Sequence, residues 1–119
     1  MNGQFKRIRI LPWVLDIWCD ALYNELVIKT FKDEPTQRIY QRQLSRKLPR
    51  DIQQVALRKL RMLNNAITLN DLRVPPANRL EKLSGDRAGQ WSIRVNDQWR
   101  ICFNWRESDA YNVEIVEYH

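Results

Sequence analysis

Residues 89–105 read GQWSIRVNDQWRICFNW, and apolar and polar side chains alternate on both sides of a short polar loop. Such alternation is typical of β-strands with one buried face. Two apolar sets have to point at the same core: Trp91, Ile93 and Val95 before the loop, and Trp99, Ile101, Phe103 and Trp105 after it. A two-residue turn would put the sets on opposite faces, whereas a three-residue loop at residues 96–98 pairs Val95 with Trp99 and aligns them. The segment therefore predicts an antiparallel hairpin with a three-residue loop.

This register places Arg94 directly opposite Arg100 on the other, polar face of the hairpin. Like charges directly across a strand pair destabilise a sheet, so an anion lying over this face would relieve the repulsion. Guanidinium groups bind phosphate through two parallel hydrogen bonds. The same face carries Gln90, Ser92, Cys102 and Asn104. It is predicted either to bind a phosphate or to be an ordinary solvated sheet face with two arginines.

The rest of the chain supplies the other elements of a small α+β fold. LVIKTF (26–31) predicts a first strand, and Asp33 or Glu34 can cap a helix that has Pro35 in its first turn and runs to about Leu44. A second helix begins near Pro49, and its apolar face consists of Ile52, Val55, Ala56, Leu60, Leu63 and Ile67. Residues 70–77 form a connecting loop, and residues 79–85 and 110–119 predict two more strands. The order is β-α-α-β-β-β, an antiparallel sheet packed against an N-terminal helical hairpin.

Residues 1–26 are predicted to be an extension of a single domain formed by residues 27–119, because the excess of positive charge falls entirely in the latter. Apolar residues recur in the extension at helical spacing: Ile10, Val14, Ile17, Trp18 and Ala21. This pattern predicts an amphipathic helix that packs on the domain, on a partner or on a second copy. Proline and aspartate interrupt the apolar run, so neither a signal peptide nor a membrane span is expected.

Charge indicates a polyanionic partner. The chain has 20 Lys and Arg against 14 Asp and Glu, a net charge of +6. Between residues 38 and 61 the basic residues are Arg38, Arg42, Arg46, Lys47, Arg50, Arg58, Lys59 and Arg61, against Asp51 alone. Segments this basic meet nucleic-acid phosphates or an acidic protein partner. A basic surface that is merely solvated remains an alternative.

Chemistry that needs a metal or another cofactor is not predicted. Cys19 and Cys102 match no zinc-ligand spacing and no disulfide framework, and one histidine adds too little for a usual zinc site. The chain contains no phosphate-binding loop, dinucleotide fingerprint or nucleophile elbow. Two cysteines without a framework fit a reducing compartment, so a cytoplasmic protein is expected.

The chain ends VEIVEYH (113–119), which groups a carboxylate, a phenol and the single imidazole. RNA carries its own nucleophile, the 2′-hydroxyl. A metal-free ribonuclease therefore needs a base for that hydroxyl, cations for the charged transition state and a proton donor for the leaving oxygen. Side chains suited to these roles are Glu81, Lys82, Arg87, Arg94, Arg100, Glu117, Tyr118 and His119.

RLEKLSGDRAGQWSIRVNDQWRICFNW (79–105), followed by YNVEIVEYH (111–119), resembles the HigB-type toxins of the RelE superfamily, as does VIKTF (27–31). The resemblance spans roughly Val27 to His119. It implies a RelE-like fold and an endoribonuclease that cleaves mRNA on the translating ribosome. It also implies a cognate HigA-like helix-turn-helix antitoxin as partner, no membrane, and contact with DNA only through the antitoxin complex.

The resemblance also implies roles for residues. Arg100 would stabilise phosphate charge. Apart from the resemblance, we expect Arg79, Lys82, Arg87 and Arg94 to bind the substrate. The C-terminal catalytic cluster would consist of Glu117, Tyr118 and His119, with His119 the leading acid or base. Some relatives have a histidine and a lysine where this chain has Glu81 and Ser84. Glu81 is therefore expected either to act as the general base or to weaken RNA binding by repulsion.

Strand alternation conflicts with this cluster. If Tyr111, Val113 and Ile115 face the core, Glu117 and His119 also turn to the core side and Tyr118 alone turns toward Arg100, unless a bulge or twist intervenes. Two other functions stay open. One is a non-catalytic RelE-like module that binds RNA or protein, supported mainly by Glu81 and Ser84, and the other is a superfamily toxin directed at gyrase.

Overall fold

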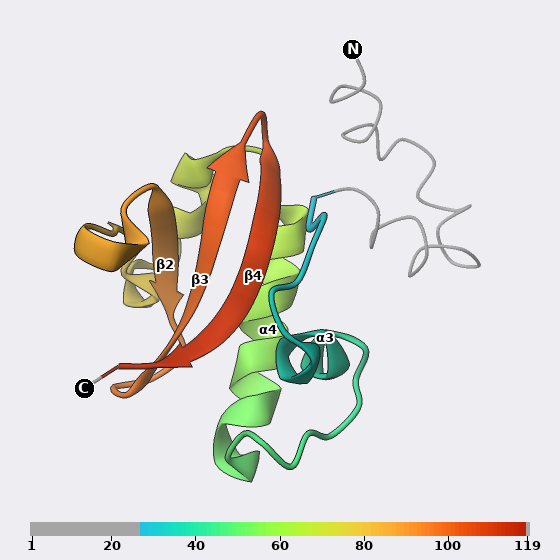
Figure 1. Cartoon of the computed structure of the whole chain (residues 1–119). Coiled ribbons are helices and arrows are strands. Elements are labelled where there is room, and N and C mark those ends of the chain that lie inside the picture. Colours follow the sequence, from blue (N-terminus) through green and yellow to red (C-terminus); the bar gives the residue numbers. More distant parts are fainter. Residues whose placement is uncertain (1–26, 119) are drawn as a thin grey trace.

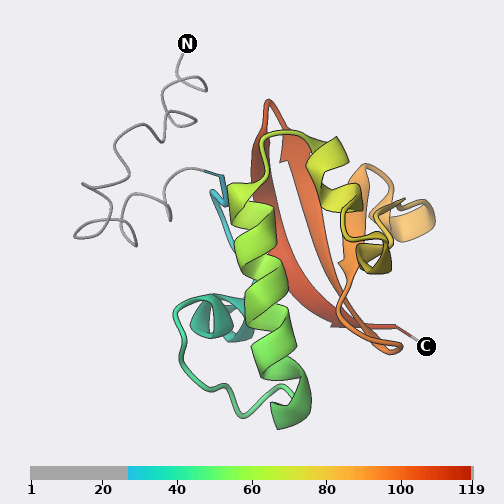
Figure 2. The same cartoon turned by 180° about the vertical axis from the view of Figure 1, so that it is seen from behind.

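The computed structural model describes residues 27–118, which form two helices and a four-stranded antiparallel sheet in the order β1-β2-β3-β4. The helices are α3 (Glu34–Tyr40) and α4 (Arg50–Asn65), and the strands are β1 (Glu81–Lys82), β2 (Gln90–Arg94), β3 (Trp99–Arg106) and β4 (Asp109–Glu117). Figure 1 shows the sheet in front of α4. Figure 2, seen from behind, shows α4 crossing the sheet with α3 beside α4. The α+β class is confirmed. The predicted N-terminal amphipathic helix lies outside the described residues.

The β2–β3 hairpin has the predicted register. Ile93 pairs with Ile101 and Arg94 with Arg100. The Val95 amide donates to the Trp99 carbonyl at 2.8 Å, which closes the loop formed by residues 96–98. The predicted register is therefore confirmed, and it keeps both apolar sets on the side of the helices.

The core lies between α4 and the sheet. Leu60 and Leu63 on α4 are fully buried, as are Ile93, Ile101 and Phe103 on the hairpin. Burying a side chain of this size contributes about 2 kcal/mol each. The amphipathic face predicted for the second helix is thus confirmed over the length of α4.

Ile67 does not belong to that face and is 49% exposed, so this part of the prediction is wrong. Helix α4 ends at Asn65, and Ala66 is already extended. The carboxylate of Asp71 accepts hydrogen bonds from the backbone amides of Ile67 and Thr68, which starts a 3₁₀ turn, Leu69–Arg73. A capping box therefore ends the helical periodicity earlier than the apolar spacing indicated.

The first helix is also shorter than predicted. The Asp33 side chain accepts a hydrogen bond from the Thr36 amide at 3.1 Å, as expected of a cap, and Pro35 lies in the first turn. The helix ends at Tyr40 rather than near Leu44, because Arg42 adopts a left-handed backbone conformation with φ of 65°. The chain up to Pro49 is therefore a loop and not helix.

The strand predicted at residues 26–31 is reduced to two isolated bridges beside β4, and both are parallel, unlike the pairings within the four-stranded sheet. Ile28 bridges to Ala110 and Phe31 to Val113, both in parallel. The Lys29 amide donates to the Ala110 carbonyl at 2.8 Å. The prediction of a wholly antiparallel sheet is therefore wrong at this edge, since alternation along a strand carries no information on the direction of its neighbour.

The strand predicted at residues 79–85 is reduced to β1, Glu81–Lys82. Arg79 is left-handed with φ of 47°, and Gly85 has φ of 65° at the start of a 3₁₀ turn, Gly85–Arg87. Such backbone conformations cannot continue a strand ladder. Residues 70–77, predicted as a plain loop, also contain 3₁₀ turns, which are Leu69–Arg73 and Pro76–Asn78. Within residues 27–118, no helix has both the length and the hydropathy that crossing a membrane requires.

Candidate active site

A hollow of about 340 Å³ lies beside the loop of the hairpin, on the sheet's polar face. It is lined by Arg79, Glu81, Arg94, Asn96, Asp97, Arg100 and Tyr118. We refer to it as the arginine cleft. The residues come from β1, from the β2–β3 hairpin and from the end of the chain, so tertiary structure brings together groups that are distant in sequence.

Arg100 forms the floor of the arginine cleft, and its orientation is fixed by the protein. The residue is only 8% exposed. Its Nε donates to the Ser92 hydroxyl at 2.7 Å, and its Nη2 donates to the Arg79 carbonyl at 2.6 Å. A guanidinium held in this way loses little side-chain freedom when it binds an anion.

The Arg79 carbonyl is itself held in place by a buried polar connection to α4. Arg79 follows the 3₁₀ turn Pro76–Asn78, and Asn78 is fully buried. The Asn78 side chain donates to the Leu72 carbonyl at 3.1 Å, and the Lys59 ammonium donates to its Oδ1 at 2.5 Å. A connection therefore runs from Lys59 through Asn78 and Arg79 to Arg100.

From the sequence, Lys59 was predicted to be one cation of a basic surface, and no role was predicted for Asn78. Lys59 is 8% exposed, and burial is the main reason that its pKa is lowered, followed by the charges of Arg58 and Arg94. Burying an ammonium is costly unless it is hydrogen-bonded, and Asn78 meets this need. One signal for Asn78 was available, because an asparagine directly after Pro-Pro-Ala is typical of a structured turn.

Tyr118 closes one side of the arginine cleft. Its ring centroid lies 6.0 Å from Cζ of Arg100, and its hydroxyl lies 3.8 Å from Sγ of Cys102. Burial, and then the hydrogen bond with Cys102, raises the pKa of Tyr118, so its phenol keeps its proton at neutral pH. The Tyr118 amide donates to the Gln98 carbonyl at 2.5 Å, which ties the end of the chain to the hairpin loop.

Two carboxylates of the protein reduce the electrostatic repulsion between Arg94 and Arg100. The Arg94 guanidinium forms an ion pair with Asp97 in the hairpin loop. The Glu81 carboxylate lies 3.7 Å from Nη2 of Arg100, and this carboxylate is about half exposed at the edge of the cleft. The like charges therefore do not by themselves require a bound anion.

Three candidate residues lie away from the arginine cleft. Glu117 pairs with Trp99, whose side chain packs on the core, so Glu117 projects from the side of the helices. Lys82 pairs with Trp91 and lies 6.0 Å from its ring centroid. Arg87 donates to Gln90 at 3.0 Å and to Glu114 at 3.3 Å, farther along the polar face.

The bulge that would have turned Glu117 toward Arg100 is present, but it lies elsewhere. The register shift falls between Cys102 and Asn104, where Asn112 of β4 has φ of 54°. Regular alternation therefore resumes before the end of β4 and brings Tyr118, but not Glu117, to the Arg100 side. His119 lies outside the described residues. Within residues 27–118, no group of His, Cys, Asp and Glu side chains is arranged to hold a metal ion.

The fold and the arginine cleft define a class, a small α+β protein with an anchored guanidinium on the sheet face opposite its helices. The chain belongs to the HigB family, because the family profile described as RelE-like toxin of type II toxin-antitoxin system HigB matches residues 29–119. The resemblance noted in the sequence is thus confirmed. A toxin of a type II system has an antitoxin as partner.

Individual relatives agree with the family profile. Toxin HigB-1 of Vibrio cholerae is 41% identical over 83 residues, covering 69% of this chain and 87% of the relative. A protein named Endoribonuclease HigB, from Proteus vulgaris, is 31% identical over 94 residues, covering 78% of this chain and the whole of the relative. An uncharacterized protein of Haemophilus influenzae is 37% identical over 84 residues, covering 70% of this chain and 83% of the relative.

Proposed function

We propose that this toxin is an endoribonuclease that cleaves mRNA on the translating ribosome, and therefore acts in the cytoplasm. The observation that carries the proposal is the fixed guanidinium of Arg100 at the floor of a cleft whose wall is a protonated phenol, Tyr118. The name of the Proteus vulgaris relative supports the same activity. The proposed antitoxin is a HigA-like helix-turn-helix protein, which alone would contact DNA.

In the proposed reaction a phosphate of the RNA occupies the arginine cleft. The 2′-oxygen attacks the adjacent phosphorus, the bond from phosphorus to the 5′-oxygen breaks, and a cyclic phosphate and a free 5′-hydroxyl result. Arg100, with Arg94 and Arg79 at the walls, stabilises the negative charge that builds up on the phosphoryl oxygens. No step in this scheme needs a metal or another cofactor.

The two proton transfers need a base and an acid. Tyr118 is the candidate for the acid that protonates the 5′-oxygen, because it lines the cleft and its phenol carries a proton at neutral pH. Glu81, 3.7 Å from Arg100, is within the same cleft and suits the role of base. His119 directly follows Tyr118 in the sequence and remains the leading alternative for either role. Glu117 is the least supported member of the proposed cluster, since it projects from the other face.

Substrate binding is proposed to extend from the arginine cleft along the polar face. Arg87 lies on that face near Gln90 and Glu114 and is positioned to contact a phosphate that flanks the cleaved one, which is a weaker role than that of Arg100. Lys82 pairs with Trp91, whose side chain packs on the core, so it is the less supported of the two for this role. Each such contact makes RNA affinity fall with rising salt concentration.

Induced expression in a bacterium tests the proposed activity. We expect growth arrest, with new mRNA 5′ ends inside coding regions, for the wild type and not for Arg100→Ala or for a chain that stops after Tyr118. Arg106→Ala is the matched control, because this cation lies on the same strand but over the ring of Tyr111, 4.3 Å from its centroid. Arrest with intact mRNA would contradict the proposal, and equal toxicity of all variants would contradict the assignment of the site.

One observation favours a second candidate, a module that binds RNA without cleaving it. The carboxylate of Glu81 occupies the arginine cleft, where it competes with a phosphate for the guanidinium of Arg100. In that case wild type and Arg100→Ala would leave mRNA intact, and RNA binding would still depend on Arg100.

A further inference from the structure

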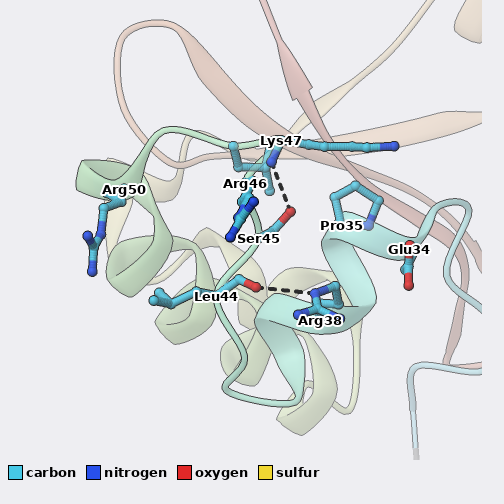
Figure 3. Close-up of a pocket in the computed structure, with 9 residues that line it drawn as sticks. Glu34, Pro35, Arg38, Leu44, Ser45, Arg46, Lys47 and Arg50 are labelled. Carbon is cyan, nitrogen blue, oxygen red and sulfur yellow. Dashed lines mark hydrogen bonds between the residues drawn. The ribbon is translucent and has the colours of Figure 1, made fainter.

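A second hollow, of about 580 Å³, lies on the helical side of the domain, between α3 and the loop that leads into α4 (Figure 3). Its cations are Arg38, Arg46, Lys47 and Arg50, against Glu34 as the one acidic residue in the lining. Pro35, Leu44 and Leu48 complete it with apolar surface. Neither the proposed cleavage reaction nor the arginine cleft uses these residues.

The loop that forms this hollow has no helix or strand, yet side chains hold it in one conformation. Gln53 of α4 donates to the Ser45 carbonyl at 2.8 Å and to the Leu48 carbonyl at 2.9 Å, and it accepts from the Ser45 amide at 3.3 Å. Nε of Arg38 donates to the Leu44 carbonyl at 3.2 Å. The hollow is therefore preformed, which lowers the entropic cost of binding.

Leu44 marks the centre of a larger apolar feature. It is 60% exposed, although a hydrogen bond from Arg38 to its carbonyl holds its backbone in place. A neighbouring hollow of about 230 Å³ shares Leu44 and adds Ile39, Arg42, Gln43, Gln53, Gln54 and Leu57. We name the two hollows together the α3–α4 groove. Its centre is apolar and its surroundings are positive, which is the arrangement of a protein–protein interface.

The composition of the groove favours a protein segment over RNA. Single-stranded RNA is held by aromatic side chains on which bases stack, together with cations that contact phosphates. The linings of both hollows contain cations but no aromatic residue. An exposed leucine between them offers nothing to a phosphate, whereas it would be buried by an apolar side chain of a peptide.

We propose that the α3–α4 groove docks an acidic segment of the antitoxin, with an apolar side chain of that segment packed on Leu44 and its carboxylates paired with Arg38, Arg46 and Lys47. The positive charge of the groove favours an acidic occupant, and the type II toxin family supplies the partner. The groove lies on the opposite side of the sheet from the arginine cleft. The antitoxin therefore holds the toxin by a surface that is separate from the catalytic groups.

Binding of the purified antitoxin encoded with this toxin tests the proposal, using the full chain with Arg100→Ala so that the host survives. We expect Leu44→Ser, and separately the double substitution Arg46→Glu with Lys47→Glu, to weaken binding at least about tenfold in calorimetry. Matched controls are Val74→Ser, another exposed apolar residue at 72% exposure, and Arg106→Glu, and both should leave the affinity unchanged. All five substituted residues are on the surface, and equal melting temperatures will show that the four variants are folded.

Unchanged antitoxin affinity in both groove variants would overturn the proposal. A fluorescein-labelled oligouridine is the second probe. If the charge reversal weakens its binding while antitoxin binding is unchanged, the groove is an RNA surface and the proposal is wrong. The assay does not depend on RNA cleavage, so its failure is distinguishable from failure of the proposed ribonuclease activity.

Discussion

Arg94 and Arg100 face each other across the hairpin, and the way each charge is compensated shows what the residues of the cleft do. Arg94 pairs with an exposed loop carboxylate, Asp97, whereas Arg100 is bound by a hydroxyl and a carbonyl with Glu81 only nearby. Exposed ion pairs contribute little, typically about 0–1 kcal/mol, and exchange readily. Arg94 is thus free to leave Asp97 for a phosphate, while Arg100 is fixed to receive one.

Glu81→Gln tests the role of the carboxylate in the arginine cleft. Removing a negative charge 3.7 Å from Nη2 of Arg100 should raise RNA affinity. If Glu81 is the base, the cleavage step slows by about 10²–10⁴-fold at the same time. The measurements are single-turnover cleavage of ribosome-bound mRNA and binding of uncleaved RNA. An increase in both affinity and cleavage would show that Glu81 acts only by repulsion.

Tyr118→Phe keeps the ring beside Arg100 and removes the hydroxyl. Burial and the Cys102 hydrogen bond raise the pKa of Tyr118 above its ordinary value of 10.0. The fold therefore favours the protonated phenol, and the stability that results is fully present below that ordinary value and is lost as the pH rises through the higher folded pKa. We expect the difference in unfolding free energy between wild type and variant to be constant from about pH 7 to 9 and to decrease above about pH 10.

Denaturant titrations at several pH values measure this difference in stability. The same variant should cleave more slowly at neutral pH by a factor of about 10²–10⁴ if the phenol is the proton donor. Cleavage at the wild-type rate would assign that role to another group, with His119 the first to examine.

At the scale of elements, α4 supports the arginine cleft although it lies on the other side of the sheet. Asn78→Ala removes the acceptor of Lys59 and the donor to the Leu72 carbonyl, and should destabilise the fold by about 1–3 kcal/mol. It also loosens the turn that presents the Arg79 carbonyl to Arg100. Small misplacements of catalytic groups are costly, so we expect kcat to fall by about ten- to a hundredfold with little change in KM.

Asn70→Ala is the matched control for Asn78→Ala. Asn70 lies in the preceding 3₁₀ turn, and its side chain accepts from Arg73 on the surface, with no connection to Arg100. Both variants are compared at a temperature where thermal melts show them folded. A loss of activity in Asn78→Ala that merely follows the folded fraction would mean that Asn78 has a structural role alone.

At the scale of the whole molecule, the described residues 27–118 contain a buried apolar core formed by both helices and the sheet. Deletion of residues 1–26 should therefore leave toxicity intact and shift the melting temperature by less than about 4 °C, which is under about 1 kcal/mol for a domain of this size. Growth assays and thermal melts measure the two quantities. Loss of folded protein would show that the extension is part of the domain.

Parts of the fold and the site were predictable for identifiable reasons. The hairpin register was predictable from the pairing of Val95 with Trp99. A shift of one residue would turn the apolar side chains of one strand away from the core. Tyr118 was expected beside Arg100 by the same alternation, and the structure agrees. The parallel direction of the Ile28 bridge was not predictable. It depends on how the two helices place residues 27–31 relative to β4, which is tertiary information.

By itself the sequence determined the α+β class, the hairpin, the amphipathic face of α4 and the family, because each depends on periodicity or on residues close together in the chain. Tertiary structure alone decided that Glu81 and Arg79 lie beside Arg100, and that the bulge in β4 falls where it leaves Glu117 on the other face. It also decided that Lys59 is buried against Asn78 rather than exposed with the other cations. These features depend on contacts between segments that are distant in the sequence. A local sequence pattern does not show whether a charged side chain will be buried or which residue will satisfy its hydrogen bonds.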